Sequence, residues 1–202
     1  YSAVASLQAA QRFRLAQLTV TMCPPLIHEA AAGPQCAVMR AEMSKRIAEI
    51  RPRTVVLASA WYRDAPGLEQ KLNETIAFLR TSGVAEIIIV GPPPKWAPTL
   101  PIALFHELRT SGSIPSVLPA DPRRLAETRL LEARLRAIAT RANVRYVSLL
   151  DVLCEPQGCL TRVSEALPGG LVATDGEHIS SAAAAYVVER ALGPLLPGGS
   201  RQ

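Results

Sequence analysis

The feature that most constrains the fold is a set of short apolar runs separated by helical patterns. Thr54–Ala58 and Glu86–Val90 are runs of strand length rich in Val and Ile, and Arg145–Leu149 is a further strand candidate. Strands that are apolar along their whole length, rather than alternating, indicate a sheet that is buried on both faces. Helical patterns between such strands provide the crossovers of parallel β-α-β units. We therefore predict an α/β fold with a parallel sheet covered by helices on both faces.

The other predicted elements continue this alternation. We expect helices over residues 3–13, 37–50, 67–82, 102–110, 122–142 and 180–192, and a further strand over residues 15–21. A doubly wound sheet usually opens with a strand, whereas this chain opens in a helix. We therefore expect a first strand, followed by a tight turn, upstream of Tyr1. We predict one domain over residues 1–196 and a flexible tail over residues 197–202. The stretch 96–118 is expected to form a loop over the active site, which in parallel sheets lies at the carboxyl ends of the strands.

Composition excludes some classes of function. The 202 residues carry a net charge of +5, but Lys and Arg are scattered, and aromatic residues make up only 4 % of the chain. Nucleic-acid binding would need a basic stripe with stacking aromatics, so we expect no such partner. The charge still suits anionic glycans or membrane surfaces. No apolar run reaches the roughly 18–20 residues that span a bilayer. No signal peptide starts at Tyr1, so if the protein is exported we expect its targeting information to lie outside this chain.

The four cysteines fall into two local pairs. Cys23 and Cys36 flank one loop that contains Pro and Gly, and Cys154 and Cys159 flank another. Four cysteines allow three connectivities, and we favour the local one because each pair spans a loop that can turn back on itself. Disulfides would indicate an oxidising compartment such as the periplasm. Reduced structural cysteines and a zinc site are the alternatives, although the spacings match neither zinc fingers nor zinc ribbons.

The clearest chemical motif lies near the C-terminus, where residues 174–180 read Thr-Asp-Gly-Glu-His-Ile-Ser. Asp175 stands three residues ahead of His178 at an expected loop-to-helix junction, and this pair can form the Asp–His half of a serine-hydrolase triad. The carboxylate can hold the imidazole Nδ1–H, which leaves Nε2 free to take a proton from a nucleophile. The alternatives are a turn or helix-capping acid for Asp175 and a surface position for His178. The chain offers no convincing nucleophilic serine.

Several motifs in order resemble one family. They are a Cys-Pro-Pro loop at residues 23–25, a Val-Val-Leu-Ala-Ser-Ala-Trp strand end at residues 55–61, Gly-Pro-Pro-Pro at residues 91–94, and Asp-x-x-His-Ile-Ser at residues 175–180. This set resembles the SGNH (GDSL-like) domain fused to the C-terminus of acyltransferase-family-three membrane proteins, and the resemblance covers nearly the whole chain. It implies a three-layer α/β/α sandwich with a parallel, flavodoxin-like sheet whose first strand is missing from the chain.

The resemblance also implies roles for particular residues. His178 would be the general base and Asp175 its orienting carboxylate. The family's catalytic serine lies in a Gly-Asp-Ser motif after the first strand, and we expect this motif just ahead of Tyr1. Ser2 is the alternative nucleophile, but it lacks the Gly-Asp context and falls within a predicted helix. The family's oxyanion Gly and Asn are replaced by an Ala-Trp-Tyr-Arg stretch. A backbone N–H near Trp61 or the Arg63 side chain could substitute. Both residues are also candidates for substrate contact, since an indole face stacks well on sugars and Arg63 could contact an acyl donor or a glycan acid group. The alternatives are core packing for Trp61 and a solvated loop for Arg63.

The function that the resemblance implies is O-acylation of bacterial surface glycans such as lipopolysaccharide. The domain would accept an acyl group, expected to be acetyl, from a membrane domain of the same polypeptide and pass it through a serine ester to a carbohydrate hydroxyl. A carbohydrate esterase of the SGNH type and an inactive glycan-binding or docking module are the alternatives. The expected location is the periplasm, with a tether to the inner membrane through an N-terminal membrane domain outside this chain. We expect no cofactor and no metal.

Overall fold

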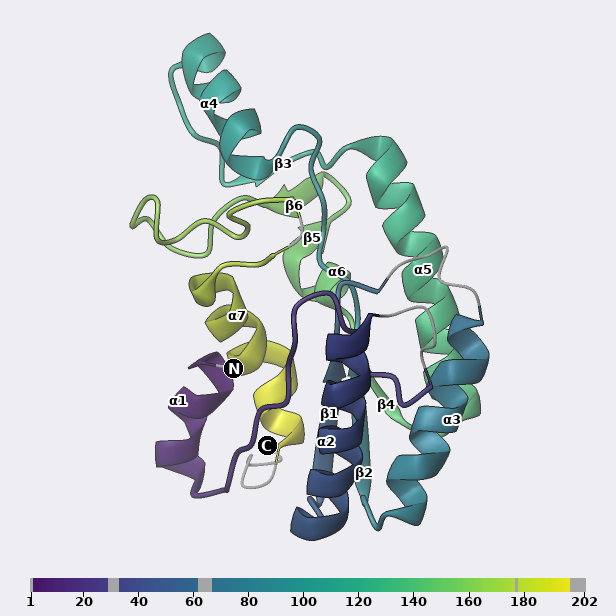
Figure 1. Cartoon of the computed structure of the whole chain (residues 1–202). Coiled ribbons are helices and arrows are strands. Elements are labelled where there is room, and N and C mark those ends of the chain that lie inside the picture. The colour runs from purple at the N-terminus through teal and green to yellow at the C-terminus, as the bar shows by residue number, and fades with distance from the viewer. Residues whose placement is uncertain (1, 29–32, 62–66, 177, 197–202) are drawn as a thin grey trace. The chain divides into compact units, whose positions relative to one another are not determined.

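The computed structural model describes residues 2–28, 33–61, 67–176 and 178–196 (Figure 1). The chain divides into two compact units, which are treated separately below. The first comprises Tyr1–Leu15, Pro92–Leu131 and Ser148–Gln202, and the second comprises Ala16–Gly91 and Glu132–Val147. The predicted tail over residues 197–202 lies outside the described residues, and the single domain over residues 1–196 stays a prediction.

The second unit contains a parallel sheet of strand order β1-β2-β4. Strands β1 (Thr54–Ala58) and β2 (Glu86–Val90) have the predicted bounds, and β4 (Arg145–Val147) is shorter than predicted because Ser148 caps a helix. Parallel pairing sets Val56 opposite Ile88 and Val90 opposite Val147. The apolar run of β2 is explained by its central place between two neighbours.

Two features of this sheet show that one side of β1 lacks a partner. Among the described strands β1 pairs only with β2, and Val56 is 36 % exposed. The prediction of a strand over residues 15–21 is wrong, because the chain is irregular there and exposes Leu18 and Val20. In the doubly wound order 2-1-3-4-5 the first strand lies between the second and the third. A first strand upstream of Tyr1, which would take that place, stays a prediction.

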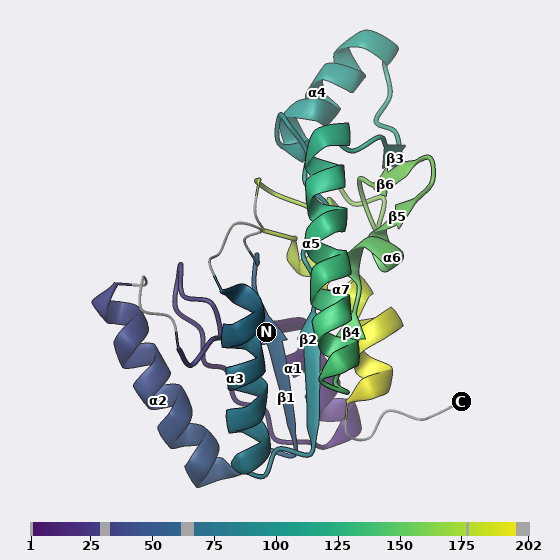
Figure 2. The ribbon, with the colours of Figure 1, turned by 90° about the vertical axis from the view of Figure 1, so that its right-hand side faces the viewer.

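Helices α2 (Pro34–Ile50) and α3 (Leu68–Thr81) confirm the predicted helices and run beside the parallel strands (Figures 1 and 2). Each buries side chains at spacings of three and four residues, as a helix packed on one face does. The buried set is Cys36, Met39, Met43 and Ile47 in α2, and Leu68, Leu72, Thr75, Ile76 and Leu79 in α3. The second half of α5 (Pro122–Arg141) lies next to α3, because Arg141 forms an ion pair with Glu69.

The Cys-Pro-Pro loop is fastened to these helices at two points. A disulfide joins Cys23 to Cys36 in the first turn of α2, with the Cα atoms 5.3 Å apart. The backbone N–H of Ile27 donates to Thr75 Oγ1 at 3.1 Å, and the adjacent Leu26 is buried. The second disulfide joins Cys154 to Cys159. The predicted local pairing of the cysteines is therefore confirmed.

The first unit contains an antiparallel sheet that was not predicted, of order β3-β6-β5. Its strands are very short: β3 (Val117–Leu118), β5 (Cys154–Glu155) and β6 (Gly158–Leu160). The disulfide between Cys154 and Cys159 links a directly opposed pair of β5 and β6. Gly158 is required where β6 meets β3, because a Cβ there would lie 2.6 Å from the Leu118 carbonyl oxygen.

The helices of the first unit are α1 (Ser2–Gln11), α4 (Leu100–Ser111), α6 (Leu149–Leu153) and α7 (Ser181–Val187). The first half of α5 also belongs to it. Helix α7 continues as a π-helical turn, Val188–Leu192, and a 3₁₀ turn, Gly193–Leu195. Helix α1 packs against α7 (Figure 1). None of the helices in the described part of the chain is both long and apolar enough to cross a membrane.

Candidate functional site

The Asp-x-x-His motif forms a closed loop immediately before α7. An isolated antiparallel bridge joins Ala173 to Ile179 at the base of the loop, and the backbone N–H of Ser180 donates to the Val172 carbonyl at 2.9 Å. Ser180 is also the N-cap of α7, because its Oγ accepts from the N–H of Ala183 at 3.0 Å. The loop therefore has both ends fixed, one by the bridge and one by the helix start.

Within this loop Asp175 binds His178 through both of its carboxylate oxygens. Oδ1 accepts the backbone N–H of His178 at 2.8 Å, and Oδ2 lies 2.9 Å from the ring Nδ1. The first contact is that of a turn acid, and the second has the geometry expected of an Asp–His pair. The catalytic role of the two residues stays a prediction. Because a carboxylate only accepts, Nδ1 carries the proton and Nε2 of the neutral ring presents a lone pair.

The pair is open to solvent, with side-chain exposures of 77 % for His178 and 53 % for Asp175. Within the described residues, His178 makes no hydrogen bond other than the two to Asp175. Its Nε2 is therefore available to an incoming hydroxyl. An exposed pair of this kind contributes little to stability, typically about 0–1 kcal/mol.

Ser2, the alternative nucleophile, is the first residue of α1 and is exposed. Its carbonyl accepts the hydroxyl of Ser6, an ordinary contact within a helix. None of the hydrogen bonds between described residues joins Ser2 to His178. The prediction that Ser2 falls within a helix is thus confirmed, and its role as a nucleophile gains no support.

Trp61 stands at the carboxyl end of β1 and is buried, with an exposure of 3 %. Its indole Nε1–H donates to the Val90 carbonyl at 2.7 Å, which ties the end of β1 to the end of β2. Trp61 has a positive φ of 42°, a conformation that is uncommon for a bulky residue. The indole N–H is thus engaged in holding two strand ends together. An oxyanion role for a backbone N–H near Trp61 stays a prediction, and Arg63 lies outside the described residues.

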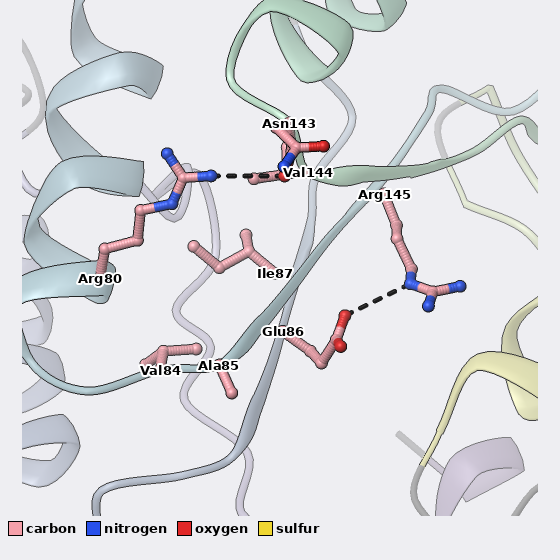
Figure 3. Close-up of a pocket in the computed structure, with 8 residues that line it drawn as sticks. All are labelled: Arg80, Val84, Ala85, Glu86, Ile87, Asn143, Val144 and Arg145. Atoms are coloured by element: carbon pink, nitrogen blue, oxygen red, sulfur yellow. Dashed lines mark hydrogen bonds and ion pairs between the residues drawn. The ribbon is translucent and has the colours of Figure 1, made fainter.

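A polar pocket of about 420 Å³ opens in the second unit (Figure 3). It lies at the amino ends of β2 and β4, whereas sites of parallel sheets lie at the carboxyl ends. Arg80 donates to the carbonyls of Ala142 and Asn143, and Arg145 pairs with Glu86 at 3.3 Å. The pocket's charged groups are therefore engaged in structural contacts, and we do not assign it a catalytic role. No group of three His, Cys, Asp or Glu side chains able to hold a metal occurs among the described residues.

A parallel α/β sheet, paired cysteine loops and an Asp–His pair ahead of α7 are the features that the resemblance to an SGNH domain predicts. The sequence model of the family described as "SGNH domain (fused to AT3 domains)" matches residues 1–192. The chain belongs to this family. The predicted family and the α/β fold with a parallel SGNH-type sheet are therefore confirmed, and membership supports an acyltransferase- or esterase-like role.

The structure is similar to that of the periplasmic domain of a lipopolysaccharide acetyltransferase from Salmonella ser. Paratyphi A. The TM-score is 0.79 at 19 % sequence identity, and the alignment covers 93 % of this chain and 75 % of the Salmonella chain. At this identity the likeness shows a shared fold. No curated protein sequence matches the chain.

Proposed function

We propose that this domain transfers an acyl group through a serine ester, with His178 as the general base and Asp175 as its orienting carboxylate. The observation that carries the proposal is the Nδ1–Oδ2 contact of 2.9 Å, which leaves Nε2 unengaged and exposed. Family membership supports the same chemistry. Both the base and its orienting group come from one short loop, so the loop alone supplies half of a triad.

The reaction has two balanced steps. A serine hydroxyl adds to the carbonyl carbon of the acyl donor while His178 Nε2 takes its proton, and that proton passes to the leaving group as the donor bond breaks. A carbohydrate hydroxyl then attacks the acyl-serine, Nε2 takes its proton, and the serine oxygen leaves and recovers it. Asp175 stabilises the imidazolium in both steps and keeps the proton of the neutral ring on Nδ1.

The nucleophilic serine is proposed to lie on polypeptide upstream of Tyr1. The open edge of β1 supports this placement, because it offers a free ladder to one further parallel strand. The family's fusion to AT3 domains supports a membrane acyltransferase domain in the same polypeptide as the donor. A periplasmic location, an acetyl group and a surface-glycan acceptor belong to the same proposal and are supported by the domain from Salmonella.

The test is His178→Ala in the full-length polypeptide, with glycan O-acylation by membranes measured by mass spectrometry. Removing a triad member leaves only a small residue of the catalysis in serine enzymes, so we expect a loss of about 10³-fold or more. His106→Ala is the matched control, since His106 is an exposed histidine on α4. Unchanged acylation in His178→Ala at equal protein level would refute the proposal.

Hydrolysis is a second candidate, favoured by the 77 % exposure of His178, which lets water reach Nε2. Turnover of an acyl ester with and without a glycan acceptor separates the two activities. An esterase consumes donor at the same rate in both, whereas a transferase needs the acceptor. An inactive glycan-binding module is distinguished by the upstream sequence: a Gly-Asp-Ser there supports an enzyme, and its absence supports the module.

A further inference from the structure

A continuous series of backbone hydrogen bonds connects the antiparallel sheet of the first unit to the Asp–His loop. Thr161, directly after β6, donates its N–H to the Ser116 carbonyl at 2.9 Å. Its own carbonyl accepts the N–H of Val172 at 2.8 Å, and the Val172 carbonyl accepts the N–H of Ser180 at 2.9 Å. Four segments thus lie side by side, and the last of them begins two residues after His178.

Thr161 is the residue at the centre of this series. Its side chain is fully buried, and Oγ1 donates to the Pro115 carbonyl at 2.5 Å. The backbone and the side chain of Thr161 therefore both bind the segment that leads into β3. A buried hydroxyl that donates to one acceptor holds its backbone in place, because a shift of the backbone would leave the buried hydroxyl without that acceptor.

Because the side chains of Asp175 and His178 are exposed, their position depends on the backbone of the loop that carries them. Side chains that are 77 % and 53 % exposed have few packing contacts to hold them, so the path of the loop backbone sets where the imidazole stands. That path is fixed at Ala173 and Ile179, and the strand carrying Ala173 is held through Val172 by Thr161.

We propose that Thr161 is a positioning residue for the reaction, acting through Val172 on the loop that carries Asp175 and His178. The inference rests on the proposed function, and it adds a residue that touches neither the acyl group nor the reacting atoms. Loss of the hydroxyl lets the segment at 161 shift, and the shift passes to the base of the loop. A displacement of about 1 Å in a catalytic group can cost roughly 10²-fold in rate.

The test compares Thr161→Val and Thr161→Ser in the full-length polypeptide. Valine keeps the shape and removes the hydroxyl, whereas serine keeps the hydroxyl. We expect kcat per folded molecule to fall about tenfold or more in Thr161→Val, with KM for the acceptor nearly unchanged, and to recover in Thr161→Ser. The matched control is Thr128→Val, because Thr128 is buried but its hydroxyl binds Arg124 of its own helix. If the valine variant does not fold, Thr161→Ala takes its place.

A second readout does not depend on activity. The ring ¹⁵N shifts of His178 in the full-length polypeptide report the fraction of the Nδ1–H tautomer, and His178→Ala assigns the signal. We expect Thr161→Val to lower that fraction and Thr128→Val to leave it unchanged. If Thr161→Val has the kcat per folded molecule and the His178 ring ¹⁵N shifts of the wild type, the inference is overturned.

The two proposals fail in different ways. An inactive His178→Ala beside a fully active Thr161→Val refutes the positioning role and leaves the proposed function standing. An active His178→Ala refutes the proposed function, and the ¹⁵N shifts then decide alone whether Thr161 sets the geometry of the pair.

Discussion

Replacing Asp175 by Asn is the sharpest perturbation of the site, because the two carboxylate oxygens have different partners. Oδ1 accepts the backbone N–H of His178 and Oδ2 faces the ring Nδ1. An asparagine that keeps the first bond must turn its NH₂ group toward the ring. The NH₂ group only donates, so Nδ1 must accept and the ring proton moves to Nε2. The imidazole then has no lone pair at the position where the serine proton is to be taken.

The expected magnitude follows from that tautomer change and from the exposure of the pair. In a serine protease with a buried aspartate the same substitution lowers kcat by about 10⁴-fold. Asp175 is half exposed, so solvent weakens the electrostatic part of the effect while the tautomer part remains. We expect a loss of about 10²–10³-fold, which corresponds to roughly 2.7–4.1 kcal/mol in activation free energy. The free energy of unfolding should change by less than about 1 kcal/mol, since the pair is exposed.

The assay measures acyl-ester turnover by the full-length polypeptide alongside thermal unfolding of each variant. Glu165→Gln is the matched control, because Glu165 is an exposed acid of the same unit that pairs with Arg162. A wild-type rate in Asp175→Asn, with His178→Ala inactive, would show that the carboxylate does not orient the base. A large loss of stability would show instead that Asp175 is mainly a structural turn acid.

Two further predictions concern the framework of the second unit. Cys23→Ser with Cys36→Ser should lower the free energy of unfolding, measured by urea unfolding, by about 3 kcal/mol, because the disulfide no longer closes its loop in the unfolded chain. The wild type under reducing conditions should lose at least as much, since Cys154–Cys159 is then reduced as well, and no loss in the double variant would contradict the loop-entropy reasoning. Trp61→Phe keeps an aromatic ring but leaves the Val90 carbonyl without its indole donor, so we expect the free energy of unfolding to fall by about 1–3 kcal/mol in the same measurement. Trp96→Phe should cost less, because the indole N–H of Trp96 has no hydrogen-bond partner among the described residues.

Local patterns account for the parts of the fold that could be predicted. Strands Thr54–Ala58 and Glu86–Val90 were found with their observed bounds, because a continuous apolar run depends only on adjacent residues. The antiparallel sheet was missed because its strands have two or three residues, too few for any periodicity. The short helix Leu149–Leu153 was missed for the same reason, since its apolar residues continue the strand pattern before it.

In the candidate site, too, contacts between residues close in the sequence could be predicted and contacts between distant residues could not. The Asp175–His178 contact could be predicted because three residues of spacing bring the two side chains together in a tight loop. The roles of Thr161 and Trp61 could not, because their acceptors lie 46 and 29 residues away in the sequence. A tryptophan shortly after a parallel strand was the one available signal for Trp61, since its indole can reach the end of the neighbouring strand. Thr161 carries no comparable signal, and only the fold reveals its partner.

One further strand, proposed to lie on polypeptide upstream of Tyr1, would account for three separate observations. The segment 15–21 has strand-forming residues but no ladder, β1 has an open edge with an exposed Val56, and His178 has no nucleophile among the described residues. A further parallel strand beside β1 would pair with the backbone groups at its open edge. In a sheet of order 2-1-3-4-5 that strand is the first, and functional groups gather at the carboxyl ends of such strands. The nucleophilic serine is therefore proposed to follow that first strand.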